Sequence, residues 1–134
     1  MSTILSQFGS GIHCARDLTR GGMATALVEI AQTRGLGIRF QETQVPTRHE
    51  TPMACDMLGV DPYHLANEGC AAIFVGADIA DEVLAFLREA RYGANASIIG
   101  EVVERSDAGV VEVRRDGSLR AIKSLEGRVL PRLC

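Results

Sequence analysis

Aromatic side chains are scarce in this 134-residue chain, at 4% of its residues, and tryptophan is missing altogether. Stacking of nucleic-acid bases is therefore not expected. The formal net charge of −3 and the lack of any lysine or arginine run also argue against binding to a phosphate backbone. No stretch approaches the roughly 20 apolar residues of a membrane-spanning helix, and no secretory signal is visible. We therefore expect a cytoplasmic protein that binds neither nucleic acid nor a membrane.

Cysteine motifs for metal binding are missing too. Cys14, Cys55, Cys70 and Cys134 lie far apart, with no Cys-x-x-Cys pair and no histidine at zinc-ligand spacing. The first three are most simply small buried apolar side chains. Cys134 does not fit that interpretation, because it is the final residue and follows a segment with little to pack it.

The remaining composition, 46% hydrophobic and 23% charged, is typical of a globular domain. Periodicity and turn residues predict strands over 12–16, 38–41, 70–75 and 97–103, a 110–114/118–122 hairpin, and helices over about 22–34, 52–58 and 79–90. Asp17 and Thr19 are predicted to cap the first long helix and Asp78 the second, and strand 70–75 is predicted to be buried on both faces. The fold class is therefore α+β, a mixed β-sheet packed by two long helices and one short helix. Residues 1–126 would form one domain and residues 127–134 a flexible tail.

One segment, Asp17-Leu18-Thr19-Arg20-Gly21-Gly22, stands between a predicted strand and a helix. Paired glycines let the backbone approach a ligand closely, and the amides at the start of a helix favour an anion. Arg20 could pair with a phosphate group, and Asp17 could hold Mg²⁺. A glycine-rich turn that only starts the helix explains the pattern equally well, because it is neither a P-loop nor a complete dinucleotide fingerprint.

A second segment, Asn67-Glu68-Gly69, precedes the apolar strand. A carboxylate at the end of a core strand can serve as a general base, although an exposed glutamate in a turn is the simpler interpretation of the pattern alone. The three histidines, His13, His49 and His64, show no mutual spacing that would make a metal site. For them we expect surface or packing roles.

The third segment is the tail, Leu130-Pro131-Arg132-Leu133-Cys134. Pro131 discourages helix and keeps the chain extended. The eight residues from Gly127 would span about 25 Å if fully stretched. A thiol on such a tether could visit two sites in turn. The alternative is an incidental terminal cysteine.

Taken in this order, the segments resemble the HypE family of hydrogenase maturation enzymes, the carbamoyl dehydratases. The similar motifs are Arg16-Asp17-Leu18-Thr19-Arg20-Gly21-Gly22, Leu65-Ala66-Asn67-Glu68-Gly69, Ile98-Ile99-Gly100-Glu101-Val102 and the terminal Pro131-Arg132-Leu133-Cys134. Leu18 departs from the family, where proline is common. Each motif alone is weak, but their combination is specific and covers nearly the whole chain from about Ile12.

The resemblance implies a place in the aminoimidazole ribonucleotide synthetase superfamily, whose members use ATP and have two α/β domains per subunit. This chain would be the C-terminal domain, without the N-terminal domain that supplies most of the ATP and Mg²⁺ site and the main homodimer interface. The partner HypF would carbamoylate Cys134, ATP would drive dehydration to a thiocyanate, and the cyano group would pass to iron on the HypC–HypD complex. Glu68 would be a catalytic base, and the nucleotide site would include Asp17, Thr19, Arg20, Gly21, Gly22 and Asn67.

Two other interpretations remain open. The chain could belong to another ATP-using member of the superfamily, such as a selenophosphate synthetase, but such relatives have no use for a terminal thiol. It could instead act as a non-catalytic carrier or docking domain that presents the modified Cys134. Because the N-terminal domain is missing, we expect the chain alone neither to bind ATP tightly nor to dehydrate a carbamoyl thiol.

Overall fold

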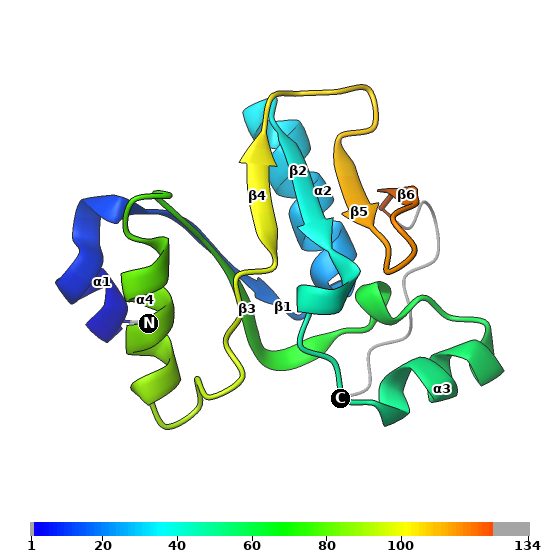
Figure 1. Cartoon of the computed structure of the whole chain (residues 1–134), viewed down its shortest axis with the longest axis horizontal. Coiled ribbons are helices and arrows are strands. Elements are labelled where there is room, and N and C mark those ends of the chain that lie inside the picture. The colour runs from blue at the N-terminus through cyan, green and yellow to red at the C-terminus, as the bar shows by residue number, and fades with distance from the viewer. Residues whose placement is uncertain (1, 125–134) are drawn as a thin grey trace.

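A computed structural model describes residues 2–124 of the chain (Figure 1). Its helices are α1 (Ser2–Phe8), α2 (Gly22–Arg34), α3 (Glu50–Leu58) and α4 (Ala80–Glu89), with single 3-10 turns η1 (Gly9–Gly11), η2 (Glu42–Gln44) and η3 (Pro62–His64). Its strands are β1 (Ile12–Leu18), β2 (Gly37–Gln41), β3 (Asn67–Val75), β4 (Gly100–Val103), β5 (Val110–Val113) and β6 (Leu119–Ile122). The predicted tail 127–134, with Cys134, lies outside the described residues.

The strands divide between two sheets. β1 and β3 form an antiparallel two-stranded ribbon, and the other sheet has the order β4-β2-β5-β6. The larger sheet is mixed, because β2 runs parallel to β5 while its other pairs are antiparallel. The α+β fold class predicted from the sequence is confirmed, although the strands share two sheets where one was expected.

Helix α2 holds the two sheets together. It lies across one face of the larger sheet (Figure 1), where Leu27, Phe40 and Val110 are almost fully buried. Phe74 of β3 and Leu18 of β1 pack against the same cluster. The helix therefore fixes the position of the ribbon relative to the sheet.

The two ends of the molecule are built differently. Helices α1 and α4 lie side by side at the far end of the ribbon (Figure 1), where the rings of Phe8 and Phe86 meet edge to face at 5.4 Å between centroids. Helix α3 projects at the opposite end and leaves Met57 87% exposed. No helix in the described part of the chain is long and apolar enough to cross a membrane.

Several local predictions were wrong. The expected polar turn 67–69 is the start of β3, and no residue of this strand is fully buried, because a two-stranded ribbon with a helix on one side leaves its other face open. The expected strand 97–103 begins only at Gly100. Asp78 does not cap α4, whose N-cap residue is Ile79 without a side-chain hydrogen bond. The hairpin around Asp116-Gly117 is confirmed, with Gly117 at φ 82°.

Candidate functional site

The two predicted site segments meet at one end of the ribbon. Leu18 pairs with Asn67, whereas the preceding residue, Asp17, pairs with Ala71. Residues 68–70 therefore have no partner on β1 and form a bulge. Glu68 stands on this bulge, directly beside the strand end that leads into residues 19–22. We call Asp17, Thr19, Arg20, Asn67 and Glu68 the ribbon corner.

The start of α2 lies against the backbone that leads into the corner. Gly21, the N-cap residue, and Gly22 have left-handed backbones, with φ of 68° and 63°. A Cβ atom on Gly22 would lie 2.5 Å from the carbonyl oxygens of Tyr63 and Leu65. The paired glycines therefore allow the helix to begin directly against the backbone that leads into Asn67, the close approach for which glycine is needed.

The predicted caps of this helix were wrong. Asp17 still belongs to β1, and the N-cap residue, Gly21, offers no side-chain hydrogen bond to the helix. Because its pairing with β3 extends β1 to Leu18, Asp17 lies too far upstream to cap. The first turn of α2 also contains no acidic side chain. The positive end of the 13-residue helix therefore has neither a side-chain cap nor an acidic side chain in its first turn.

A hollow of about 230 Å³ lies at the corner, lined by Arg16, Asp17, Thr19 and Arg20. Among the described residues, the side chains of Asp17, Thr19 and Arg20 make no hydrogen bond or ion pair. The side chains of Asn67 and Glu68 are exposed, and within the same described range they too have no polar partner. The corner therefore presents one free cation, two free carboxylates and two neutral polar groups to a ligand.

Arg16 was not predicted as a site residue, although it lies in the quoted motif beside Asp17. Its guanidinium donates to the Glu29 carboxylate of α2 at 2.6 Å, and both side chains are about half exposed. The pair joins β1 to α2 at the edge of the hollow. Arg16 is thus already paired, whereas Arg20 is free to meet a ligand. The partner of Arg16, Glu29, is 13 residues away, so only the position of Arg16 within the motif could have indicated that it lies at the site.

The corner offers little to a metal ion by itself. No group of three or more histidine, cysteine, aspartate or glutamate side chains within residues 2–124 could hold one. Asp17 supplies a single carboxylate. That suits Mg²⁺ only when substrate phosphates and water complete the octahedron, which is how proteins commonly bind this ion.

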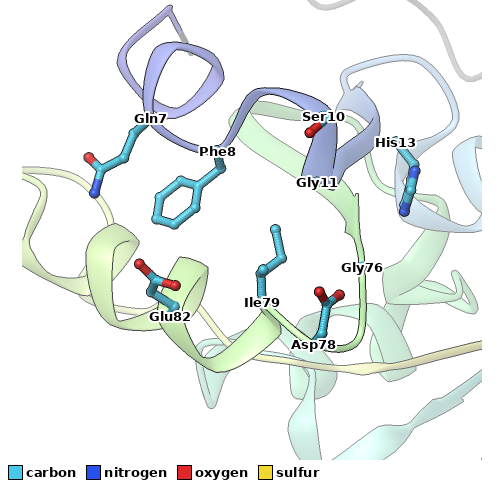
Figure 2. Close-up of a pocket in the computed structure, with 9 residues that line it drawn as sticks. All are labelled: Gln7, Phe8, Ser10, Gly11, His13, Gly76, Asp78, Ile79 and Glu82. Carbon is cyan, nitrogen blue, oxygen red and sulfur yellow. The ribbon is translucent and has the colours of Figure 1, made fainter.

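A larger hollow, of about 450 Å³, lies at the other end of the ribbon (Figure 2). Phe8 of α1 and Ile79 before α4 project into it, with Asp78 and Glu82 at its rim. Seven residues of β1, or roughly 20 Å, separate this end from the corner. Of the histidines, His13 lines this hollow, and none of the predicted site residues does.

The turn η3, which precedes Asn67, is linked through Arg120 to a buried carboxylate, that of Glu112. Glu112 of β5 is 2% exposed and accepts a hydrogen bond from Arg120 Nε at 2.6 Å. Burial, a hydrogen bond to Glu112 and the charge of that carboxylate raise the pKa of the Tyr63 phenol well above its ordinary value. Partial burial lowers the pKa of Arg120, but Glu112 and Asp61 outweigh it and raise the pKa overall. Tyr63 is therefore a neutral hydrogen-bonding group and Arg120 a permanent cation.

Comparisons with known proteins show what the whole chain is similar to. A carbamoyl dehydratase HypE of Rhodobacter capsulatus is 46% identical over 125 residues, which are 92% of this chain and 36% of that protein. The crystal structure of hydrogenase maturation protein HypE in complex with ATP matches with a TM-score of 0.87 at 35% identity, covering 100% of this chain and 42% of that one. A chain of the crystal structure of a HypE–HypF complex matches with a TM-score of 0.84 at 34% identity, covering 91% of this chain and 39% of that one.

This chain therefore spans little more than a third of the length of the relatives it matches. The family model described as "AIR synthase related protein, C-terminal domain" matches residues 2–112, which include every residue of the ribbon corner. The chain belongs to this family of AIR synthase related C-terminal domains.

Proposed function

We propose that this chain is the C-terminal part of an ATP-dependent carbamoyl dehydratase that serves hydrogenase maturation. Its Cys134 would carry the carbamoyl group and deliver the cyanide ligand of the nickel–iron hydrogenase. The observation that carries the proposal is the ribbon corner, where a helix start without a side-chain cap and a free arginine stand beside an unpaired glutamate. The similarity to HypE proteins, one of them solved with ATP, supports the same function.

The corner suits both parts of this reaction. The carbamoyl oxygen is a poor leaving group until it attacks the γ-phosphorus of ATP, which breaks the bond to ADP. The amide nitrogen then loses its protons, the C–O bond breaks with the phosphate, and a C≡N bond remains on the sulfur. Glu68 would take a proton from nitrogen. Arg20 and the amides of Gly21 and Gly22 would hold phosphate oxygens.

The remaining site residues have supporting roles. Thr19 and Asn67 would hydrogen-bond the nucleotide from either side of the corner. Asp17 would contribute one ligand to Mg²⁺, which would arrive with the nucleotide. Because Glu68 is exposed, the enclosure that such proton transfers need would come from the nucleotide and from the part of the protein that its longer relatives possess.

The proposal includes partners. A relative forms a complex with HypF, and we propose that HypF loads Cys134 here. The HypC–HypD complex would receive the cyano group, and the complete protein would be a homodimer in the cytoplasm.

The test is the intact mass of the complete protein after incubation with the carbamoyltransferase, carbamoyl phosphate and ATP. We expect one carbamoyl adduct that loses one water in an ATP-dependent step. Cys134→Ala should abolish the adduct, whereas the matched control Cys70→Ala, at an exposed cysteine beside the corner, should retain it. Carbamoylation that survives Cys134→Ala would refute the assignment of the acceptor.

A carrier role is the second candidate for the chain taken alone, because it spans only about a third of its relatives. Residues 1–134 should then accept a carbamoyl group without dehydrating it, and isothermal titration should detect no tight binding of Mg·ATP. Strong binding by this chain would mean that the corner is a complete nucleotide site.

A further inference from the structure

Strand β6, the last described element before Cys134, is fastened to the segment that leads into the corner. The Arg120 guanidinium of β6 bridges two carboxylates. Its Nε donates to the buried Glu112 carboxylate and its Nη1 donates to Asp61 Oδ2, both at 2.6 Å. Asp61 is the N-cap residue of η3, where it also accepts a hydrogen bond from the Tyr63 amide at 2.9 Å. One side chain thus joins β5, β6 and η3.

A second contact lies beside the first. His64, the last residue of η3, has its Nε2 atom 2.9 Å from the carbonyl oxygen of Lys123. A carbonyl only accepts, so Nε2 carries the proton. Nδ1 of the same ring is buried without a partner within the described range. Nδ1 also lies 3.9 Å from Asp61 Oδ2, too far for a hydrogen bond. Within the described residues, the one hydrogen bond of the ring is therefore with the backbone where the chain leaves β6.

The same short turn also meets the corner. The carbonyl of Tyr63 lies against Gly22 on one side, and its ring lies under Arg120, with 5.4 Å from the guanidinium carbon to the ring centroid. Glu68 follows His64 by four residues, a span of about 14 Å at most. Cys134 follows Lys123 by eleven residues, or about 36–40 Å when extended. The thiol can therefore reach the corner from this starting point.

We propose that His64, Asp61 and Arg120 are positioning residues that fix the root of the C-terminal segment against η3, so that the S-carbamoyl group on Cys134 is presented to the ribbon corner. This inference rests on the proposed function. A fixed root confines the tethered group near the site and raises its effective concentration. Freeing Lys123 lengthens the tether. His64 touches no reacting atom, so its effect is confined to the group carried on its own chain.

The test compares reactions in cis and in trans with the complete protein. In cis, carbamoylated protein is mixed with ATP and dehydration of its own tail is followed in a single turnover. In trans, the Cys134→Ala protein is supplied with a saturating S-carbamoylated peptide of residues 125–134. Because Ile122 stays paired with Val110, His64→Ala frees one or two residues of the tether, which should slow the cis reaction about 1.3-fold and leave the trans rate unchanged. A general loss of structure would slow both.

Two further variants sharpen the comparison. His64→Gln keeps a donor near the position of Nε2 and should restore the cis rate. His49→Ala, at a histidine whose side chain is 84% exposed at the start of α3, should leave both rates unchanged. An unchanged cis rate in His64→Ala, or equal losses in cis and trans, would overturn the positioning role.

The proposed function fails separately. If Glu68→Gln and Cys134→Ala leave carbamoylation and dehydration intact, the acceptor and base assignments are wrong, whatever His64 does. If both of these variants are inactive while His64→Ala behaves as the wild type in cis, the proposed function stands and the fixed root is refuted.

Discussion

Substitution of Gly22 by alanine tests the packing on which the corner depends. Gly22 has φ 63°, and a Cβ atom there would lie 2.5 Å from two backbone carbonyl oxygens, those of Tyr63 and Leu65. Gly35, at the other end of the same helix, has nearly the same φ, 65°, but a Cβ atom there would meet nothing within 4 Å. The two substitutions therefore differ in crowding and share the backbone strain.

The shared part can be estimated first. A left-handed backbone costs an alanine about 1–2 kcal/mol, partly offset by about 0.4–1 kcal/mol because alanine restricts the unfolded chain. Gly35→Ala should thus destabilise the chain by about 1 kcal/mol. At Gly22 the carbonyls must also retreat by nearly 1 Å, and overpacking of this kind costs about 1–3 kcal/mol more. Gly22→Ala should therefore cost about 2–4 kcal/mol.

Urea unfolding followed by circular dichroism measures both values, provided that the slope of free energy against urea is unchanged. For a chain of this length each 1 kcal/mol should lower the melting temperature by about 3–5 °C. If the two variants lose the same free energy within about 0.5 kcal/mol, the close approach between α2 and η3 is refuted. The geometry of the corner would then need another explanation.

Three other substitutions test single contacts. Arg20→Ala should weaken nucleotide binding by the complete protein about tenfold or more, the worth of a charge-assisted hydrogen bond, and should leave stability unchanged; Arg105→Ala, an exposed arginine away from the hollow, is the calorimetric control. A double-mutant cycle on Arg16 and Glu29 should give a coupling of about 0.2–1 kcal/mol that falls with added salt, because both side chains are half exposed; a coupling of 3 kcal/mol would contradict this. Hydrogen bonds from Ser118 lower the pKa of Asp116, so they favour the folded state above the ordinary pKa of that carboxyl and are lost as the pH falls through its folded value. Ser118→Ala should raise the Asp116 pKa in an NMR titration, and an unchanged pKa would refute the assignment.

Turn signals that depend on glycine predicted local structure well. The turn at Asp116-Gly117 and the end of α2 at Gly35 depend on backbone conformations that glycine adopts easily, so neighbouring residues suffice to predict them. The prediction that residues 17–22 run from a strand into a helix was correct for the same reason. Asp17 was misplaced as a cap because its conformation depends on pairing with Ala71, 54 residues along the chain.

Long-range pairing also explains the other differences. The division into two sheets depends on which strands find each other, and β2 pairs with β4 and β5 only after two intervening helices. The Arg120–Asp61 contact joins residues 59 positions apart, and no local pattern marks either as a partner. Sequence reasoning therefore predicted the two candidate site segments but could not show that they adjoin, or that the end of β6 is fastened to the same turn.

The exposure of Glu68 bears on how the complete site must be assembled. Water solvates a free surface carboxylate, and a proton taken from an amide there would exchange with solvent. Yet Asp17 and Glu68 lie on the ribbon and Arg20 follows it, and all three are exposed without a polar partner among the described residues. A relative of this chain, 36% of which is covered by the match, is more than twice its length. Exposed polar groups without partners, gathered at one corner, are what a half-site presents to a second surface. The nucleotide and that second surface would complete the site together. The contact of His64 with Lys123 would keep Cys134 within reach of the place where they meet.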